Sequence, residues 1–362
     1  MHIGIIGITK SGKTTVFNAL IRSTSAQSTG QQMNVGVAKV VDPRLDKLTA
    51  IFRPKREVYA EVRYTDIPGA PEGLGKSEGI GGEYLNALQR ADALLHVVRA
   101  FNDPSVPHIN TTVDPYRDAA AMDMELAFSD LAIIERRFKR LETDMRGAKP
   151  QERERAKKET ALLERLRDGL AADVPIRRQE VSGEEHKTIS NYQFLTAKPL
   201  LIVFNIGEDQ LPEAAKIEAE AQERLAKPKV LATAMCGKLE AELGQMTPED
   251  EGEFRATMGA GESAAARVIR ASYELVGLIP FFTVGEDECR AWTIPLDTPA
   301  VKAAGQIHSD IERGFIRAEV VGYDDFVRCG SLPEARRQGV LRLEGKTYPV
   351  RDGDIINFLF NV

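Results

Sequence analysis

The segment MHIGIIGITKSGKTT spans residues 1–15 and joins a short apolar run to a glycine-rich loop. Residues 7–14 fit the pattern G-x-x-x-x-G-K-[ST]. A strand that turns sharply into a helix through such glycines directs main-chain N–H groups and the positive helix end at phosphate oxygens. Apolar residues then recur at helical spacing, which favours a strand–loop–helix unit over a chance match: Val16, Phe17, Leu20 and Ile21. The segment predicts a site for a nucleoside triphosphate.

The pattern of this phosphate loop predicts a role for its polar residues. Lys13 is expected to reach the β- and γ-phosphates as a catalytic residue, and the Thr14 hydroxyl to hold Mg²⁺. The other loop residues that we expect to contact the nucleotide are Gly7, Thr9, Lys10, Ser11, Gly12 and Thr15.

Composition narrows the class of protein. The 362 residues suffice for two or three domains, and a net charge of −6 gives no overall sign of nucleic-acid binding. The cysteines are odd in number and far apart, which argues against a disulfide framework or a zinc site: Cys236, Cys289 and Cys329. No apolar run approaches the roughly 18 residues of a membrane helix. Because the chain opens on a core strand rather than a signal peptide, we expect a cytoplasmic protein.

A second phosphate-contacting segment follows the alternating run at residues 59–65. This run predicts a strand that leads into Asp66 and then Gly69, about fifty residues after the phosphate loop. In this order, the aspartate joins the Mg²⁺ shell and the Gly69 N–H meets the γ-phosphate. The next residue, Ala70, cannot orient a water as a glutamine would, so hydrolysis needs another group to place the water.

The polar loop at residues 23–34 has the composition of a surface segment. In a P-loop hydrolase this position is a switch that orders around Mg²⁺ and the γ-phosphate. Thr29 is the candidate hydroxyl ligand for Mg²⁺, and Thr24 competes with it. A plain surface loop explains the composition equally well.

More specific patterns occur at residues 34–37, 41–46, 79–85, 91–101, 282–294 and 303–319. They resemble the YchF (Obg-like ATPase) branch of translation-factor-type P-loop proteins, over nearly the whole chain and in the same domain order. The resemblance implies an α/β fold with a discontinuous P-loop nucleotide-binding (G) domain at residues 1–116 and 197–279, a mixed sheet flanked by helices. A helical coiled-coil hairpin is then inserted at residues 117–196, and a TGS-like β-grasp domain occupies residues 280–362.

Base recognition is expected after the apolar strand at residues 200–204. Asn205 and Glu208 form N-x-x-E where GTPases carry N-K-x-D, and the resemblance implies that ATP is preferred to GTP. A repositioned glutamate no longer presents its two-oxygen fork to guanine N1 and N2. Cys236 and Gly237 lie in a segment that resembles the family's second base-contacting loop. A GTPase of the same fold remains the alternative.

The sequence departs from the family at the phosphate loop, where Lys10 and Ser11 replace an expected asparagine and valine. In related GTPases without the glutamine, that asparagine helps to hold a monovalent cation. We hypothesise that the Lys10 ammonium takes the cation's place and supplies charge in the transition state; a solvated loop lysine is the alternative. The first switch also departs, with Gly-Gln-Gln-Met at residues 30–33.

His108 is the candidate for the missing water-orienting group. It lies in a polar loop between prolines at residues 104–115, at the point where the family also carries a histidine. An imidazole can orient or deprotonate a water near neutral pH. An exposed loop histidine without a catalytic role is the alternative.

The region between Pro115 and Pro199 changes to long helices. Apolar residues recur there at spacings of three and four, the seam of a coiled coil: Met124, Ala127, Leu131, Ile134, Phe138, Leu141 and Met145. Residues 147–150 break the pattern, which resumes as a second stripe at Leu163, Leu166 and Leu170. We expect an antiparallel helical hairpin.

Positive charge is concentrated on this hairpin. Residues 136–167 hold twelve Lys/Arg against six Asp/Glu. They form either solvated helix faces or a surface for RNA or ribosomal phosphates. Because aromatic residues are scarce there, such contact would be electrostatic and salt-sensitive.

A helix at residues 263–275 is expected to join the nucleotide-binding core to the C-terminal module. That module shows β-rich runs at residues 317–321, 340–343 and 355–360. By resemblance it is a TGS-type domain of proteins that work with RNA. Ten basic against thirteen acidic residues do not themselves indicate RNA binding, and a packing or interaction module is the alternative.

The sequence thus favours a cytoplasmic, Mg²⁺-dependent P-loop ATPase that couples slow hydrolysis to binding the ribosome or another translation-linked partner. The water would attack the γ-phosphate in line while Lys13, Thr14 and the loop amides stabilise the charge. The alternatives are a GTPase switch of the same fold and a nucleotide-responsive adaptor without catalysis.

Overall fold

The structure is a computed structural model that describes residues 1–23, 33–67, 82–257 and 261–361. The chain divides into two units. The first unit comprises Met1–Ala38 and Arg63–Leu275, and the second comprises Lys39–Val62 and Val276–Val362. No described helix combines the length and the apolar character that crossing a bilayer requires.

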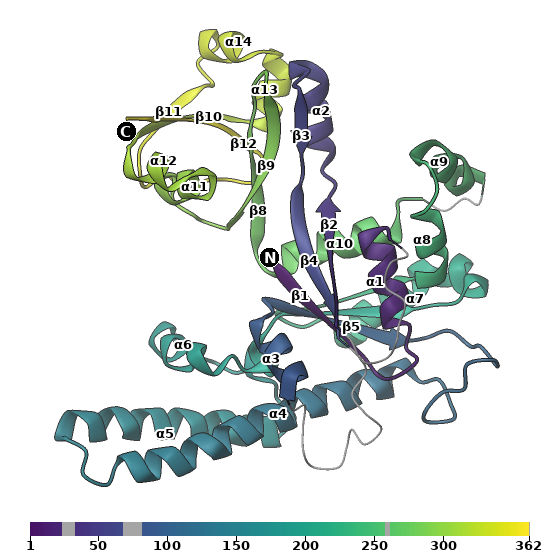
Figure 1. The fold of residues 1–362 in the computed structure, drawn as a ribbon, viewed down its shortest axis with the longest axis vertical. Coiled ribbons are helices and arrows are strands. Elements are labelled where there is room, and N and C mark those ends of the chain that lie inside the picture. Colours follow the sequence, from purple (N-terminus) through teal and green to yellow (C-terminus); the bar gives the residue numbers. More distant parts are fainter. Residues whose placement is uncertain (24–32, 68–81, 258–260, 362) are drawn as a thin grey trace. The chain divides into compact units, whose positions relative to one another are not determined.

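The first unit is built on a six-stranded sheet in the order β2-β4-β1-β5-β6-β7. Figure 1 labels β1, β2, β4 and β5 of this sheet. The strands are β1 His2–Ile6, β2 Asn34–Val40, β4 Ala60–Asp66, β5 Ala93–Arg99, β6 Leu200–Asn205 and β7 Val230–Met235. β1 pairs in parallel with β4 and β5, β5 with β6, and β6 with β7. The carboxyl ends of these parallel strands therefore meet at one edge, where α/β proteins bind their ligands.

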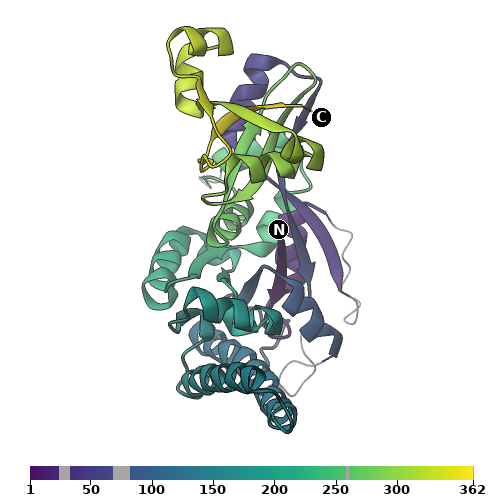
Figure 2. The ribbon, with the colours of Figure 1, turned by 90° about the vertical axis from the view of Figure 1, so that its left-hand side faces the viewer.

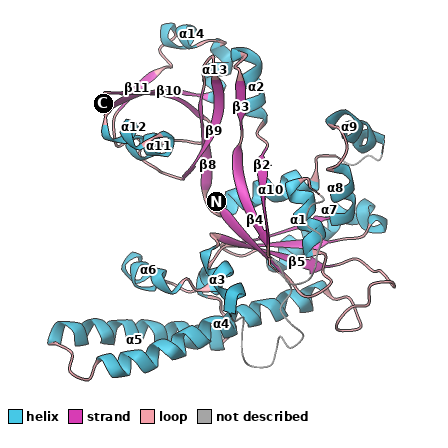
Figure 3. Ribbon diagram, in the orientation of Figure 1, coloured by secondary structure: helices cyan, strands magenta, loops and turns pink. Residues whose placement is uncertain are grey.

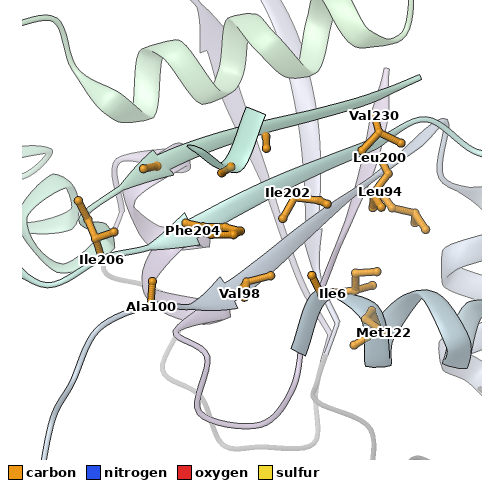
Figure 4. Close-up of a cluster of buried hydrophobic side chains, with 14 of the residues drawn as sticks. Ile6, Leu94, Val98, Ala100, Met122, Leu200, Ile202, Phe204, Ile206 and Val230 are labelled. Atoms are coloured by element: carbon orange, nitrogen blue, oxygen red, sulfur yellow. The ribbon is translucent and has the colours of Figure 1, made fainter. Parts of the chain in front are cut away.

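Every residue of β5 and β6 is buried, because helices cover both faces of the sheet (Figure 3). Figure 4 shows Ile202 and Phe204 of β6 close to Val98 of β5 in one apolar cluster, to which Met122 of α4 also belongs. The helices of this unit are α1 Lys13–Ile21, α3 Gly82–Arg90, α4 Pro115–Asp144, α5 Pro150–Ala171, α6 Gly183–Ile189, α7 Ala214–Leu225, α8 Gly237–Leu243, α9 Pro248–Thr257 and α10 Ala264–Leu275. Short 3₁₀ helices among the described residues occupy Ile176–Arg178, Ser190–Tyr192, Leu195–Ala197 and Glu208–Glu213.

The predicted helical hairpin is present as α4 and α5, which lie alongside one another (Figures 1 and 2). Asp114 caps α4 by accepting from the Arg117 N–H at 3.1 Å. The apolar stripe pairs the helices through Ile134 and Leu141 of α4 and three predicted leucines of α5, Leu163, Leu166 and Leu170. Met124 is an exception, since it is 50% exposed; the seam begins further along α4, where α5 is available as a partner.

The second unit is built on a sheet in the order β11-β10-β12-β8-β9-β3. Its strands are β3 Arg56–Val58, β8 Leu278–Thr283, β9 Glu288–Pro295, β10 Phe315–Gly322, β11 Arg342–Glu344 and β12 Asp354–Phe360, and its helices are α2 Pro43–Phe52, α11 Ala300–Ile307, α12 Ser309–Arg313, α13 Tyr323–Cys329 and α14 Leu332–Arg337. β8 forms a hairpin with β9 and runs parallel to β12, which is antiparallel to β10. This arrangement is that of a β-grasp sheet, and its TGS assignment stays a prediction.

Residues 39–62 belong to the second unit, although the sequence places them in the nucleotide-binding domain. β3 pairs in parallel with β9, with Arg56 opposite Glu288. Phe52 of α2 stacks on Phe326 of α13 with ring centroids 5.4 Å apart. These contacts join residues more than two hundred positions apart, so no local pattern could reveal them.

Candidate nucleotide-binding site

The phosphate loop lies between β1 and α1, and glycine is required at both of its ends. Gly7 and Gly12 have φ values of 152° and 89°, which side-chain-bearing residues rarely adopt. A Cβ on Gly7 would lie 2.4 Å from the Val97 carbonyl oxygen, and one on Gly12 would lie 2.2 Å from Asn205 Nδ2. The tight path of the loop along β5 and β6 therefore depends on these two glycines.

The start of α1 is left open to an anion. Gly12 supplies no side-chain cap, and the first turn carries no acidic residue. The first N–H groups of a helix have no partner within the helix, and the helix dipole adds positive potential there. This end of α1, which includes Thr14 and Thr15, can therefore receive phosphate oxygens as predicted.

Lys13 is buried at the loop and is folded back over it. Its Nζ donates to the carbonyl oxygens of Gly7 at 2.9 Å and Ile8 at 3.1 Å. Burial lowers the pKa of Lys13 to about 8, although the nearby charge of Asp66 opposes this shift. Phosphate oxygens would raise this pKa again, because they would add negative partners to the one that Asp66 supplies.

Thr14 and Asp66 come together as the sequence predicts for a Mg²⁺ site. The Thr14 hydroxyl donates to Asp66 Oδ2 at 2.7 Å, while Asp66 Oδ1 is buried and has no hydrogen-bond partner among the described residues. The buried Ser11 hydroxyl is likewise unpartnered in the described structure. Leaving such groups buried and unpaired is costly, and hydroxyl and carboxylate oxygens are ligands that Mg²⁺ accepts. The donor set therefore fits a Mg²⁺–nucleotide complex.

Asn205 connects the phosphate loop to the predicted base-contacting loop. Its Nδ2 donates to the Ser11 carbonyl oxygen at 3.0 Å, and its Oδ1 accepts from the Gly237 N–H at 3.0 Å. Both contacts are buried. Asn205, Gly237 and the phosphate loop are thus held as one framework, as expected of residues at the carboxyl ends of neighbouring parallel strands.

Glu208 and Lys238 form an ion pair at 2.9 Å near this framework, with both side chains more than half exposed. Cys236 precedes α8 and is buried, and burial raises the pKa of its thiol. The contacts of Glu208 and Cys236 with the base stay predictions, and the sequence gives no indication of the Glu208–Lys238 ion pair. A Cβ on Gly12 would also lie 3.9 Å from the ring of Phe101, so this aromatic residue lies beside the phosphate loop without any sequence signal for it.

Lys10 is exposed in the phosphate loop, with a φ of 65°. No hydrogen bond or ion pair from its ammonium to a described residue is present, which leaves it available to a ligand. Thr29, its competitor Thr24, and Gly69 lie outside the described residues.

His108 is not an exposed imidazole, and both of its ring nitrogens are engaged. Nε2 is 2.8 Å from Asp118 Oδ2, and Nδ1 accepts from the Asn110 N–H at 3.0 Å. Asp118 also accepts from Arg117 at 2.9 Å. In this structure the histidine closes its own loop onto the start of α4, so a water-orienting role stays a prediction that requires these bonds to open.

Comparisons with known proteins agree with this geometry. A family model described as a 50S ribosome-binding GTPase matches residues 2–130, and one for the YchF-GTPase C-terminal region, described as a protein of unknown function, matches residues 278–361. The ribosome-binding ATPase YchF of Bacillus subtilis is 38% identical over 99% of both chains, and that of Escherichia coli O157:H7 is 36% identical over 99% of both.

Solved structures give the same result. The YchF GTPase of Schizosaccharomyces pombe superposes with a TM-score of 0.85 at 30% identity, over 99% of this chain and 97% of that one. A GTP-binding protein of Pyrococcus horikoshii, at 16% identity and a TM-score of 0.59, shares the fold. Full-length identity, the two family models and the phosphate-loop framework together show that this chain belongs to the YchF family.

Proposed function

We propose that this chain binds ATP with Mg²⁺ at its phosphate loop, prefers ATP to GTP, and hydrolyses ATP slowly in a cycle coupled to ribosome binding. The observation that carries the proposal is the hydrogen bond of 2.7 Å from the Thr14 hydroxyl to Asp66 Oδ2. The other carboxylate oxygen of Asp66, Oδ1, is buried and has no partner among the described residues. The names of the Bacillus and Escherichia relatives, ribosome-binding ATPases, support the activity and the partner.

The residues of the loop would act chiefly by position and charge. Lys13 would leave the Gly7 and Ile8 carbonyl oxygens for the β- and γ-phosphates, and the N-terminus of α1 would hold the phosphate chain. Bound Mg²⁺, held by Thr14 and by Asp66, would neutralise phosphate charge. A water attacking in line would then meet a γ-phosphate whose developing negative charge is already stabilised.

The Glu208–Lys238 ion pair supports the preference for ATP. A glutamate already paired with an ammonium at 2.9 Å is a poor acceptor for guanine N1 and N2, whereas adenine offers no donor at those positions. GTP is the second candidate, favoured by the description of the Schizosaccharomyces relative as a GTPase. Competition of unlabelled ATP and GTP for one fluorescent nucleotide analogue decides between them, and equal or tighter GTP binding would reject the ATP preference.

The exposed cations of the hairpin support the ribosome as partner. Of the twelve basic residues at 136–167, Arg137, Arg165 and Arg167 are paired with carboxylates. The other nine are exposed and form no ion pair with described residues: Arg136, Lys139, Arg140, Arg146, Lys149, Arg153, Arg155, Lys157 and Lys158. Contact with ribosomal phosphates through such side chains should weaken steeply as salt is raised.

The decisive experiment is single-turnover phosphate release from ATP with and without purified ribosomes, with Lys13→Ala as the inactive control. Release that ribosomes accelerate supports the whole proposal. Release that occurs but ignores ribosomes leaves an ATPase without this coupling. Nucleotide binding without release, in both conditions, would show that the chain is an adaptor rather than an enzyme.

A further inference from the structure

One edge of β12 is left open in the second unit. β12 pairs with β10 from Asp354 to Phe360, but with β8 only at Ile355, opposite Phe282. β8 ends at Thr283, so β12 runs on past it. Beyond Ile355, no described residue pairs with this edge of β12. Every second residue there directs its N–H and C=O away from β10, and these groups have no strand partner.

This open edge lies in a groove of about 420 Å³. Side chains from both faces of β12 line it, since Ile356 and Phe358 alternate with Asn357 along the strand. Because side chains from both faces of β12 line the same groove, the groove lies along the edge of this strand. Further apolar lining comes from Val284, Ile307, Ile311, Leu332, Leu341 and Phe360. The groove therefore offers main-chain bonds along its floor and apolar contacts at its sides.

Natural sheets usually protect such an edge with a charge, a proline or a covering element. Residues 357–360 read Asn-Phe-Leu-Phe and contain neither a charge nor a proline. Phe360 is 46% exposed, although an aromatic ring is more stable out of water. The sequence at this edge thus suits a binding strand better than a protected one.

The charges of the groove favour a polypeptide over RNA as its occupant. Arg336 donates to Glu319 at 2.6 Å, and Asn357 donates to the other oxygen of Glu319 at 2.9 Å, so the lining cation is already neutralised. The second unit as a whole carries sixteen basic and seventeen acidic side chains. RNA backbones require an excess of positive charge, whereas an uncharged polypeptide strand requires none.

We propose that this groove receives an extended polypeptide segment, which pairs with the open edge of β12 in the parallel direction and continues the line of β8. Its alternate side chains would be apolar and would enter the groove, the usual pattern when a peptide adds a strand to a sheet. The proposal rests on the function proposed above and identifies the source as an extended segment of a ribosomal protein. The second unit would then contact protein, while the basic hairpin contacts RNA.

Photo-crosslinking of the full-length chain tests the occupant directly. Phe360 is replaced by p-benzoyl-L-phenylalanine, which keeps the aromatic ring, and the chain is irradiated on purified ribosomes. The matched control carries the same group at Leu343, which is exposed on β11 and is separated from β12 by β10. A crosslink from position 360, but not 343, to a ribosomal protein supports the proposal. A crosslink to ribosomal RNA, a crosslink to a second copy of this chain, or no crosslink on bound ribosomes overturns it.

A charge placed in the groove gives an independent measurement. Phe360→Asp is expected to weaken co-sedimentation with ribosomes at least fivefold, while Leu343→Asp leaves it unchanged and both variants keep the wild-type ATP turnover without ribosomes. Circular dichroism checks that the Phe360→Asp chain is folded. If the folded variant binds ribosomes with wild-type affinity, the proposed role of the groove is wrong. If the wild-type chain does not bind ribosomes at all, the proposed function itself fails, so the two failures are distinguishable.

Discussion

Asn205 is bonded to Gly237, whose main-chain N–H donates to Asn205 Oδ1 at 3.0 Å, while the amide nitrogen of the same side chain donates to the Ser11 carbonyl oxygen at 3.0 Å. One side chain therefore connects the phosphate loop to the start of α8 and fixes the distance between them. Because a single asparagine satisfies both loops, its loss should affect phosphate and base contacts together.

Asn205→Ala should weaken ATP and GTP binding by a similar factor. Each of the two lost buried hydrogen bonds costs about 1 kcal/mol, so we expect Kd for both nucleotides to increase by up to roughly thirtyfold. Fluorescence titration with a labelled nucleotide measures it. Asn191→Ala, an exposed asparagine outside the site, is the control. An unchanged Kd would show that the loops keep their places without this bridge.

Nucleotide affinity should fall as the pH rises above about 8. Burial lowers the pKa of Lys13 to about 8, and phosphates bind only its charged form. Between pH 8 and the ordinary lysine value, the nucleotide-free protein loses the proton that binding must restore. Affinity should decline by up to tenfold per pH unit there, and calorimetry in buffers of different ionisation enthalpy should detect proton uptake on binding.

The stability of the nucleotide-free protein should change with pH in the opposite direction to the nucleotide affinity. Its folded state holds the Lys13 proton less tightly than the unfolded state, so the lysine's contribution to the free energy of unfolding rises from pH 8 upward. Lys13→Arg is the control, because a guanidinium stays charged over this range. A wild-type affinity that is flat from pH 7 to 9.5 would contradict the assignment.

The parts of the site that the sequence predicts are those whose position follows from order along parallel strands. Asp66 and Asn205 are each the last residue of a strand in one sheet. They therefore lie beside the phosphate loop regardless of the length or conformation of the segments that connect the strands. Contacts between distant segments carry no such signal. Lys238 meets Glu208, and β3 meets β9, through pairing that only the folded chain defines. His108 is predicted to orient the attacking water, with an exposed loop histidine as the alternative. The sequence does not reveal that Asp118, ten residues later on the first turn of α4, binds its ring.

Glu240 lies on α8, three residues after Gly237, and the structure places it in a buried network. Its carboxylate accepts from both terminal nitrogens of Arg255, at 3.1 and 2.8 Å, and from the N–H groups that begin α10. Burial alone would raise its pKa, but the bonds from Arg255 and Ser263 outweigh burial and lower it. Glu240 thus joins α8, α9 and α10 in one buried network.

Glu240→Gln should lower the free energy of unfolding by about 2 kcal/mol, because an amide cannot accept both bonds from Arg255, which keeps the Glu251 carboxylate as a partner at 2.9 Å. Chemical denaturation followed by circular dichroism measures the loss. Glu242→Gln changes the other, exposed glutamate of α8 and should be nearly neutral. Equal effects of the two variants would mean that the buried network adds no stability.

Lys10 offers the sharpest test of how the phosphate is cleaved. Its φ of 65° lies in the left-handed region, which asparagine tolerates better than lysine, so a lysine at this position carries a conformational cost. If it supplies transition-state charge, Lys10→Ala should slow single-turnover hydrolysis about tenfold, the effect of roughly 1.4 kcal/mol on the barrier, with little change in ATP Kd. Wild-type hydrolysis should be the same in potassium and sodium salts. Lys216→Ala, an exposed lysine on α7, controls for loss of charge alone. Lys10→Asn should relieve the backbone strain without restoring the rate of hydrolysis in sodium salts. Full activity in Lys10→Ala would show that Lys10 is only a solvated loop residue.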